Sequence, residues 1–365
     1  MSTSNLHGLH HAGVAVWSDS ISKAMLDSGD LTRRLSEEAV TGVTSNPTIF
    51  SNAIVGSDDY TAKLTELKSS GLSTEKVVKA LMADDIQRAC DVLADVHSST
   101  DGKDGFVSVE VSPTLADDVK ATVAEARAWV KQIDRPNLLV KVPATLAGVK
   151  AVRKLIGEGV SVNVTLIFSL ERYSEVIDAY LDGLDHYNEM GGDLTKVASV
   201  ASFFVSRFDT EVDKRLEQIG TPEARALMGK TAVANARAAY GIFTNEFGST
   251  RYGMLAMKGA HPQKPLWAST STKNPEYDDL LYVEELVAAN TINTMPLDTI
   301  AAYQDHGTPN PIAFNAVDVA HAKATLHHME TAGVDYNGVV ETLEQEGVDK
   351  FVASWNELLK GAESV

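Results

Sequence analysis

A lysine stands in the middle of a short apolar run, residues 138–142 (LLVKV), which has the pattern of a buried β-strand. Lysine is among the residues least often buried, because removing water from an ammonium group is costly. Burial favours the neutral amine, and a neutral amine attacks carbonyl carbon to form a Schiff base. Lys141 is therefore a candidate nucleophile. The alternative is a lysine at a strand end that points into water, and this stretch by itself leaves both open.

A carboxylate occupies the same kind of position in another apolar run. Glu110 and Lys141 each stand between two valines, and they can meet if the two strands are neighbours. One interpretation is a buried structural salt bridge, which is not a strong source of stability. The other is a nucleophilic amine with a carboxylate that transfers protons to water and to a carbinolamine.

Other apolar runs also carry a polar side chain within them or just after them: Asp19, Asn46, Asn163, Thr165, Ser202 and Ser269. Asn163 and Thr165 are two residues apart and so face the same side of a strand. Each residue has an ordinary explanation as well, since Asn46 could cap a turn before Pro47 and Ser202 could be a small filler. If these polar residues lie together at one end of the fold, they predict a polar site suited to a polyhydroxylated ligand.

Two basic residues follow later runs. Arg207 lies two residues beyond the run that ends at 205, and Lys273 lies just past the run that ends at 270. Together they could form the local cationic end that binds a phosphate. The alternative is solvated surface charge.

Eight apolar runs are separated from one another by helical patterns, as parallel strands with crossovers require. The runs cover residues 14–19, 39–47, 106–111, 138–142, 160–168, 197–205, 265–270 and 290–295. Helical patterns cover 21–35, 60–68, 75–96, 115–133, 147–156, 170–190, 277–288 and 339–359, with several helices expected up to 259.

Eight such units predict an α/β fold, a single (β/α)8 TIM barrel over residues 14–365 with a lead-in at 1–13. Additional helices are expected between the sixth and seventh strands and at the C-terminus. A doubly wound sheet would also alternate, but no glycine-rich nucleotide motif follows any strand. In a barrel the active site lies at the C-terminal mouth, where all the polar residues above would converge.

Composition limits the possible partners. The chain has 32 Lys and Arg against 50 Asp and Glu, for a net charge of −18, which disfavours nucleic acid and anionic membranes as partners. The single cysteine, Cys90, excludes an intramolecular disulfide, suits a reducing cytoplasm and is expected to be a core residue. The N-terminus lacks signal-peptide features and no run approaches a membrane span, so a cytoplasmic location is expected. His7, His10 and His11 lack companion ligands, and no metal or cofactor is expected.

Five segments in this order resemble the transaldolase family, and the likeness covers most of the chain: 42–50 (GVTSNPTIF), 107–111 (VSVEV), 139–145 (LVKVPAT), 163–169 (NVTLIFS) and 202–207 (SFFVSR). Segments 266–270 (LWAST) and 290–296 (NTINTMP) are similar to the long form found in actinobacteria.

The resemblance implies a cofactor-free transferase of the pentose phosphate pathway. Lys141 would form a Schiff base with the ketone of fructose 6-phosphate or sedoheptulose 7-phosphate. Glu110 and Thr165 would hold and activate water, and Asp19 would take the proton from the C4 hydroxyl as the C3–C4 bond breaks. The bound dihydroxyacetone unit would then pass to glyceraldehyde 3-phosphate or erythrose 4-phosphate. A monomer or a homodimer is expected.

The resemblance also implies how the sugar is held. Arg207 would bind the phosphate, and the hydroxyls would be bound by Asn46, Asn163 and Ser202. Many members carry a second arginine after the seventh strand, in a Ser-Phe-Arg context. Here residues 269–273 read STSTK. Ser269 and Lys273 are therefore the candidates for binding the substrate on that side, and Lys273 would act on the phosphate as a monodentate point charge.

Two alternatives remain open. An aldolase of the same superfamily would release free dihydroxyacetone, but related fructose 6-phosphate aldolases carry glutamine in place of Glu110 and tyrosine in place of Phe204. A non-catalytic sugar-phosphate-binding barrel would lack or misplace Lys141, Glu110 or Asp19, and all three are present.

Overall fold

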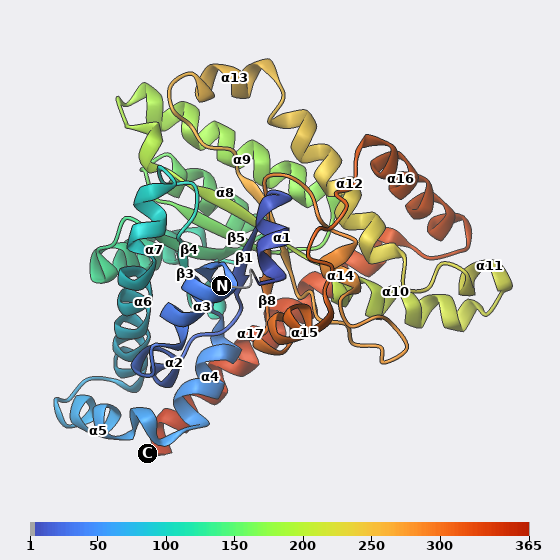
Figure 1. Cartoon of the computed structure of the whole chain (residues 1–365). Helices are drawn as coiled ribbons and strands as arrows, with labels where there is room; N and C mark the ends of the chain where they lie inside the picture. The colour runs from blue at the N-terminus through green and yellow to red at the C-terminus, as the bar shows by residue number, and fades with distance from the viewer. Residues whose placement is uncertain (1–3, 365) are drawn as a thin grey trace.

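Eight parallel strands close into a barrel in the computed structural model, which describes residues 4–364 (Figure 1). Each strand pairs with the next in the chain, and the last pairs with the first. The prediction of a (β/α)8 barrel is confirmed. The strands are β1 (Val14–Ser18), β2 (Val40–Val43), β3 (Val107–Glu110), β4 (Leu138–Pro143), β5 (Val162–Ile167), β6 (Ser199–Phe204), β7 (Lys264–Ala268) and β8 (Thr291–Met295).

Strand register places three polar residues at one level of the barrel. Glu110 of β3 pairs with Lys141 of β4, and Lys141 pairs with Asn163 of β5. Thr165 pairs with Pro143, two residues further along both strands. Directly paired residues of parallel strands point to the same face, so this set shares one face of the sheet at neighbouring levels.

Helices surround the barrel and extend its ends (Figure 1). The α-helices are α1 (Leu6–His11), α2 (Lys23–Asp27), α3 (Asp30–Glu38), α4 (Pro47–Val55), α5 (Thr61–Ser69), α6 (Thr74–Ser99), α7 (Val119–Ile133), α8 (Leu146–Ile156), α9 (Leu170–Glu189), α10 (Ser206–Ile219), α11 (Pro222–Arg225), α12 (Thr231–Glu246), α13 (Thr250–Ala256), α14 (Leu281–Glu284), α15 (Leu297–His306), α16 (Ala316–Thr331) and α17 (Tyr336–Ser364). The 3-10 helices are η1 (Asp58–Tyr60), η2 (Pro113–Leu115) and η3 (Leu194–Lys196). The expected extra helices are present, as α10–α13 between β6 and β7 and as α16 and α17 at the C-terminus.

Several predicted helices have other bounds. The helix expected over 21–35 is two helices, because Gly29 adopts the left-handed conformation (φ 74°) between α2 and α3. The helix expected from 115 begins at Val119, since Pro113 opens η2 and Asp118 caps α7 by accepting from the Ala121 N–H.

The helix expected over 277–288 is the largest error. Only α14, four residues long, forms in that stretch. Instead the segment is held by side chains, since the Tyr277 and Tyr282 hydroxyls donate to Asp213 and Asp209 of α10 at 2.7 and 2.8 Å. Long-range hydrogen bonds of this kind override a local helical pattern.

The lead-in expected at the N-terminus contains α1, whose Leu6 and Leu9 are fully buried. Asn5 donates to the backbone carbonyls of Tyr303 and Gly307, which lie at α15 and just after it. This segment is therefore part of the packed structure. Within residues 4–364, no group of three His, Cys, Asp or Glu side chains is arranged to hold a metal ion, and no helix is long and apolar enough to cross a membrane.

The last helix, α17, lies across the C-terminal mouth of the barrel. It contacts α4, which follows β2, η2, which follows β3, and also β5 and α10. Figure 1 shows α17, in red, beside α4, in light blue, so two segments far apart in the sequence pack together there. Segments that follow different strands of the barrel therefore all pack against α17.

Candidate active site

Lys141 and Glu110 form a buried ion pair inside the barrel. Their side chains are 5% and 1% exposed, and Nζ of Lys141 lies 3.5 Å from Oε2 of Glu110. Nζ also donates to the backbone carbonyl of Ser45 at 3.2 Å, and the Ser45 hydroxyl is itself anchored to the carbonyl of Ser108. The lysine therefore does not point into water, and the alternative of a solvent-facing lysine at a strand end is wrong.

The Glu110 carboxylate is the less satisfied partner. Neither of its oxygens accepts a close hydrogen bond from the described residues, and 3.5 Å is long for a charge-assisted bond. Burial raises the pKa of Glu110 to about 7, against the opposing attraction of Lys141. Such a carboxyl group can both hold and release a proton near neutral pH.

Asp19 supplies a second carboxylate, directly after β1. Its Oδ1 accepts from the Thr44 hydroxyl at 2.7 Å, and its backbone N–H donates to Met295 of β8. Its position at the pocket wall is half-buried. Desolvation raises the pKa of Asp19, and Lys141 is the largest opposing influence. Lys141 therefore acts electrostatically on two carboxylates, one directly after β1 and one on β3.

Asn163 and Ser202 belong to one buried hydrogen-bond chain. The Ser202 hydroxyl donates to Oδ1 of Asn163 at 2.7 Å, and Nδ2 of Asn163 donates to the Ser108 hydroxyl at 3.0 Å. Thr165 is fully buried, and its hydroxyl has no hydrogen-bond partner among the described residues. A buried hydroxyl of this kind calls for a ligand or water partner.

Asn46 both caps a helix and lines the cavity at the barrel mouth. Its side-chain oxygen accepts from the Ile49 N–H at 3.0 Å and so caps α4. The side chain also lines the pocket. Its NH2 group is therefore the part that can serve a ligand.

A cavity of about 230 Å³ opens at the barrel mouth. Seven of the predicted site residues line it: Asp19, Asn46, Lys141, Ser202, Arg207, Ser269 and Lys273. The other three, Glu110, Asn163 and Thr165, are buried and do not line it. The structure thus brings the predicted set together around one space.

Basic groups collect at one side of this cavity. The guanidinium of Arg207 stacks on the ring of Phe204 at 5.0 Å, and burial lowers its pKa. Lys273 donates to the Ser271 hydroxyl at 2.7 Å. Burial lowers the pKa of Lys273, and nearby Lys350 and Arg207 lower it further. Basic side chains gathered in this way form a ready site for an anion.

Sequence reasoning missed the residues that α17 brings to the site. Lys350 and Phe351 line the cavity. The ring of Phe351 lies 5.8 Å from Nζ of Lys141 and 5.9 Å from Cζ of Arg207. The helical pattern near the C-terminus was visible, but nothing local indicated that the helix crosses the mouth. The remaining lining residues are Thr44, Thr48, Ile49, Phe204, Ala268, Ser271, Thr294 and Pro296.

Ser269 has an unusual backbone. Its φ of 57° lies in the left-handed region that favours glycine. Its hydroxyl is hydrogen-bonded to that of Ser206, the first residue of α10, at 2.8 Å, and its carbonyl accepts from the Ser206 N–H. The end of β7 is thereby tied to the turn that carries Arg207, and backbone strain of this kind is common at functional sites.

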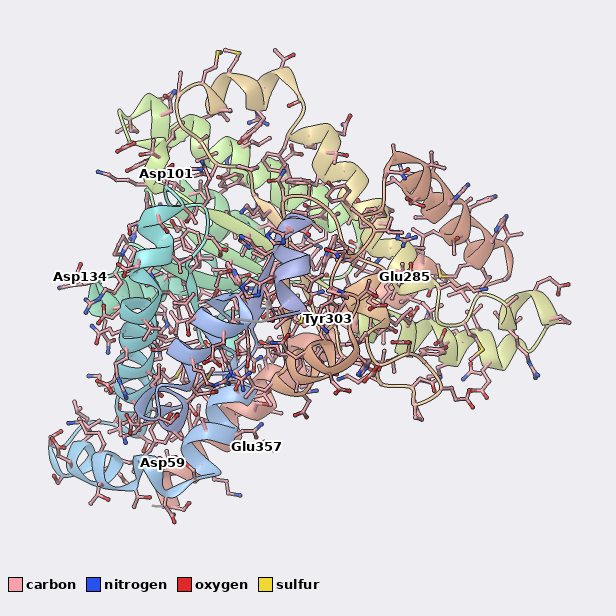
Figure 2. The ribbon with its side chains drawn as sticks, in the orientation of Figure 1. Asp59, Asp101, Asp134, Glu285, Tyr303 and Glu357 are labelled. Atoms are coloured by element: carbon pink, nitrogen blue, oxygen red, sulfur yellow. The ribbon has the colours of Figure 1, made fainter. Side chains whose placement is uncertain are left out.

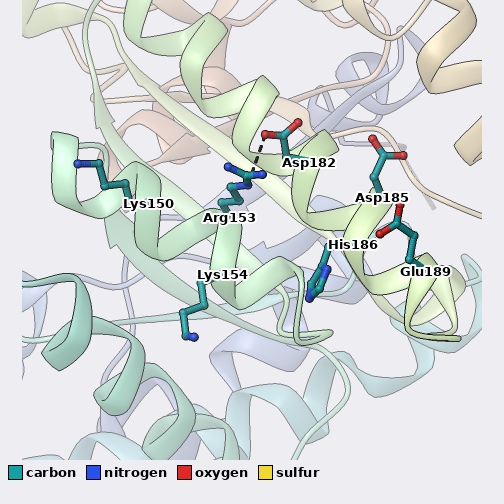
Figure 3. Close-up of a pocket in the computed structure, with 7 residues that line it drawn as sticks. All are labelled: Lys150, Arg153, Lys154, Asp182, Asp185, His186 and Glu189. Carbon is teal, nitrogen blue, oxygen red and sulfur yellow. Dashed lines mark ion pairs between the residues drawn. The ribbon is translucent and has the colours of Figure 1, made fainter.

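Two other features lie apart from this site. Cys90 is buried in α6, and burial raises the pKa of its thiol to about 12, as suits a core residue. A hollow of about 400 Å³ lies between α8 and α9 on the outer layer (Figure 3). Charged side chains of both signs line it, and Arg153 pairs there with Asp182 at 3.4 Å.

The closed barrel with its polar mouth places the chain among the (β/α)8-barrel enzymes. Residues 16–362 match the family model described as transaldolase/fructose-6-phosphate aldolase. The chain belongs to this family, which confirms the resemblance drawn from the five segments.

Similar proteins span almost the full length. The chain is 54% identical to the transaldolase of Thermobifida fusca over 98% of the chain and 96% of that protein. It is 52% identical to the transaldolase of Acidothermus cellulolyticus, over 98% and 95% of the two chains. With the transaldolase of Mycolicibacterium smegmatis the identity is 50%, over 97% and 95%.

Proposed function

We propose that this protein is a transaldolase that moves a dihydroxyacetone unit between sugar phosphates through a Schiff base on Lys141. Fructose 6-phosphate and sedoheptulose 7-phosphate would be the donors, and erythrose 4-phosphate and glyceraldehyde 3-phosphate the acceptors. The observation that carries the proposal is the buried amine of Lys141, 3.5 Å from Glu110 and open to a cavity that Asp19 also lines. The pentose phosphate pathway and a cytoplasmic location remain predictions.

The first half of the reaction forms the imine. Once it has given up its proton, the amine of Lys141 attacks the C2 carbonyl of the ketose, and the resulting carbinolamine loses water. Glu110, with a pKa near 7, donates the proton that the departing hydroxyl needs and later takes one from water. Thr165, with its unpartnered hydroxyl, would hold that water next to Glu110.

The second half breaks and remakes a carbon–carbon bond. Asp19 accepts the proton of the C4 hydroxyl, the C3–C4 electron pair moves into the iminium, and an aldose phosphate leaves. The enamine then attacks the aldehyde carbon of an acceptor, and the aldehyde oxygen takes the proton from Asp19 to become the new hydroxyl. Hydrolysis of the new imine releases the product ketose and restores the amine.

The remaining residues would position the sugar. Ser202 and the NH2 group of Asn46 reach the cavity and can bind hydroxyls. Asn163 would orient Ser202, to which it is already hydrogen-bonded, and keeps one further N–H. The phosphate would lie against Arg207, Ser269 and Lys273.

A transferase and an aldolase differ in what they do without an acceptor. We expect fructose 6-phosphate alone to release at most about one equivalent of glyceraldehyde 3-phosphate per site rapidly, because the enamine waits for an acceptor. Erythrose 4-phosphate should then restore continuous turnover. A coupled assay with and without acceptor measures this. Fast multiple-turnover release of dihydroxyacetone without an acceptor would show an aldolase instead.

A further inference from the structure

The cavity contains a basic side chain that comes from outside the barrel. Lys350 belongs to α17, and it lines the same space as Arg207 and Lys273. Its neighbour Phe351 is buried and lies 5.9 Å from Cζ of Arg207. The helix therefore presents Lys350 at the cationic side of the pocket.

The part of α17 that carries Lys350 is fixed from both sides. Gly347 lies against Leu166 and Phe168, where an added Cβ would come within 3.1 Å of Leu166. One turn beyond Lys350, the Ser354 hydroxyl is hydrogen-bonded to Thr48 of α4 at 2.8 Å. These contacts hold this turn of α17 between β5 and α4. The backbone at Lys350 is thus held in place, so only the exposed lysine side chain has to be ordered on binding.

The charge of the cavity contrasts with that of the whole protein. Four basic side chains and one carboxylate line it, in a chain whose net charge is −18. Acidic side chains such as Asp59, Asp134 and Glu357 lie instead at the periphery (Figure 2). Such a local excess of positive charge attracts a small anion and fixes its orientation.

We propose that Lys350 completes the phosphate subsite, binding the phosphate dianion of the donor and acceptor sugars together with Arg207 and Lys273. The ammonium acts as a point charge and does not need a particular plane of approach. The last helix of the chain thereby sets the preference for phosphorylated over unphosphorylated sugars. This inference rests on the proposed function for the identity of the substrate. The first of the two tests below measures phosphate binding alone and does not depend on that function.

The first test measures binding without catalysis. Inorganic phosphate is titrated calorimetrically into the wild type, Lys350→Met and Lys360→Met. Lys360 is an exposed lysine of the same helix outside the cavity. We expect Lys350→Met to weaken phosphate binding by about 10–100-fold, as for loss of a charge-assisted contact, and Lys360→Met to match the wild type. Equal affinity in all three proteins would overturn the proposal, whether or not the enzyme proves to be a transaldolase.

The second test measures specificity. The concentration of each donor that half-saturates inactivation by borohydride is compared for fructose 6-phosphate and for unphosphorylated dihydroxyacetone. Lys350→Met should raise the value for fructose 6-phosphate about 10–100-fold and that for dihydroxyacetone at least tenfold less, and Lys350→Arg should recover most of the loss. An equal rise for both donors would mean that Lys350 maintains the shape of the pocket, and would refute a role in phosphate binding.

Discussion

Replacement of Lys141 by methionine is expected to lower turnover by about 10⁴–10⁶-fold, the order of loss seen when a covalent nucleophile is removed. Methionine has a similar length and no charge, so it should fit the buried position between Glu110 and Phe351. The measurement is the rate of transfer from fructose 6-phosphate to erythrose 4-phosphate.

The matched control is Lys154→Met, which removes an exposed lysine of α8. It should retain wild-type activity, and circular dichroism should show that both variants are folded. Retention of more than about a tenth of the activity by folded Lys141→Met would remove Lys141 as the nucleophile.

Replacement of Glu110 by glutamine is expected to slow Schiff-base formation and hydrolysis by about 10²–10⁴-fold, the usual contribution of a general acid–base group. The amide keeps the shape of the side chain in a fully buried position but cannot donate or accept the proton. Rapid-mixing kinetics with fructose 6-phosphate would separate imine formation from carbon–carbon cleavage. Glu357→Gln, at an exposed position of α17, is the control that should change neither step.

The pH dependence of imine formation is a second test of the role of Glu110. Burial raises the pKa of Glu110 to about 7, so the group is mostly protonated and able to donate below pH 7, and mostly ionised and able to accept above it. The wild-type rate of imine formation should change slope near pH 7, and that inflection should be absent from Glu110→Gln. An unchanged profile in the variant would assign the inflection to another group and exclude Glu110 from proton transfer.

The barrel was predictable because its signal is local. Each strand is an apolar run, and the residues that interrupt those runs, such as Glu110 and Lys141, are the ones that face the site. Consecutive parallel strands then place the two side by side, as their register confirms. The position of Asp19 followed from the same rule, since it comes directly after β1.

The rest of the site depends on contacts between distant segments. Thr44 was part of a recognised motif, yet its bond to Asp19 exists because β1 and β2 are neighbours. Lys350 and Phe351 reach the pocket because α17 crosses the mouth, and a helical pattern does not say where its helix lies. The helix predicted around Tyr277 is absent for a related reason. The Tyr277 hydroxyl donates a hydrogen bond to Asp213 of α10, and this long-range contact holds the segment in a non-helical conformation.

The central claim is that Lys141 carries the dihydroxyacetone unit as a Schiff base. Incubation with fructose 6-phosphate, reduction with borohydride and mass mapping of the peptides would test it most directly. We expect a stable adduct of a reduced three-carbon unit on the peptide that contains Lys141, and none in Lys141→Met. An adduct on a different lysine, or an unmodified protein after reduction, would contradict it.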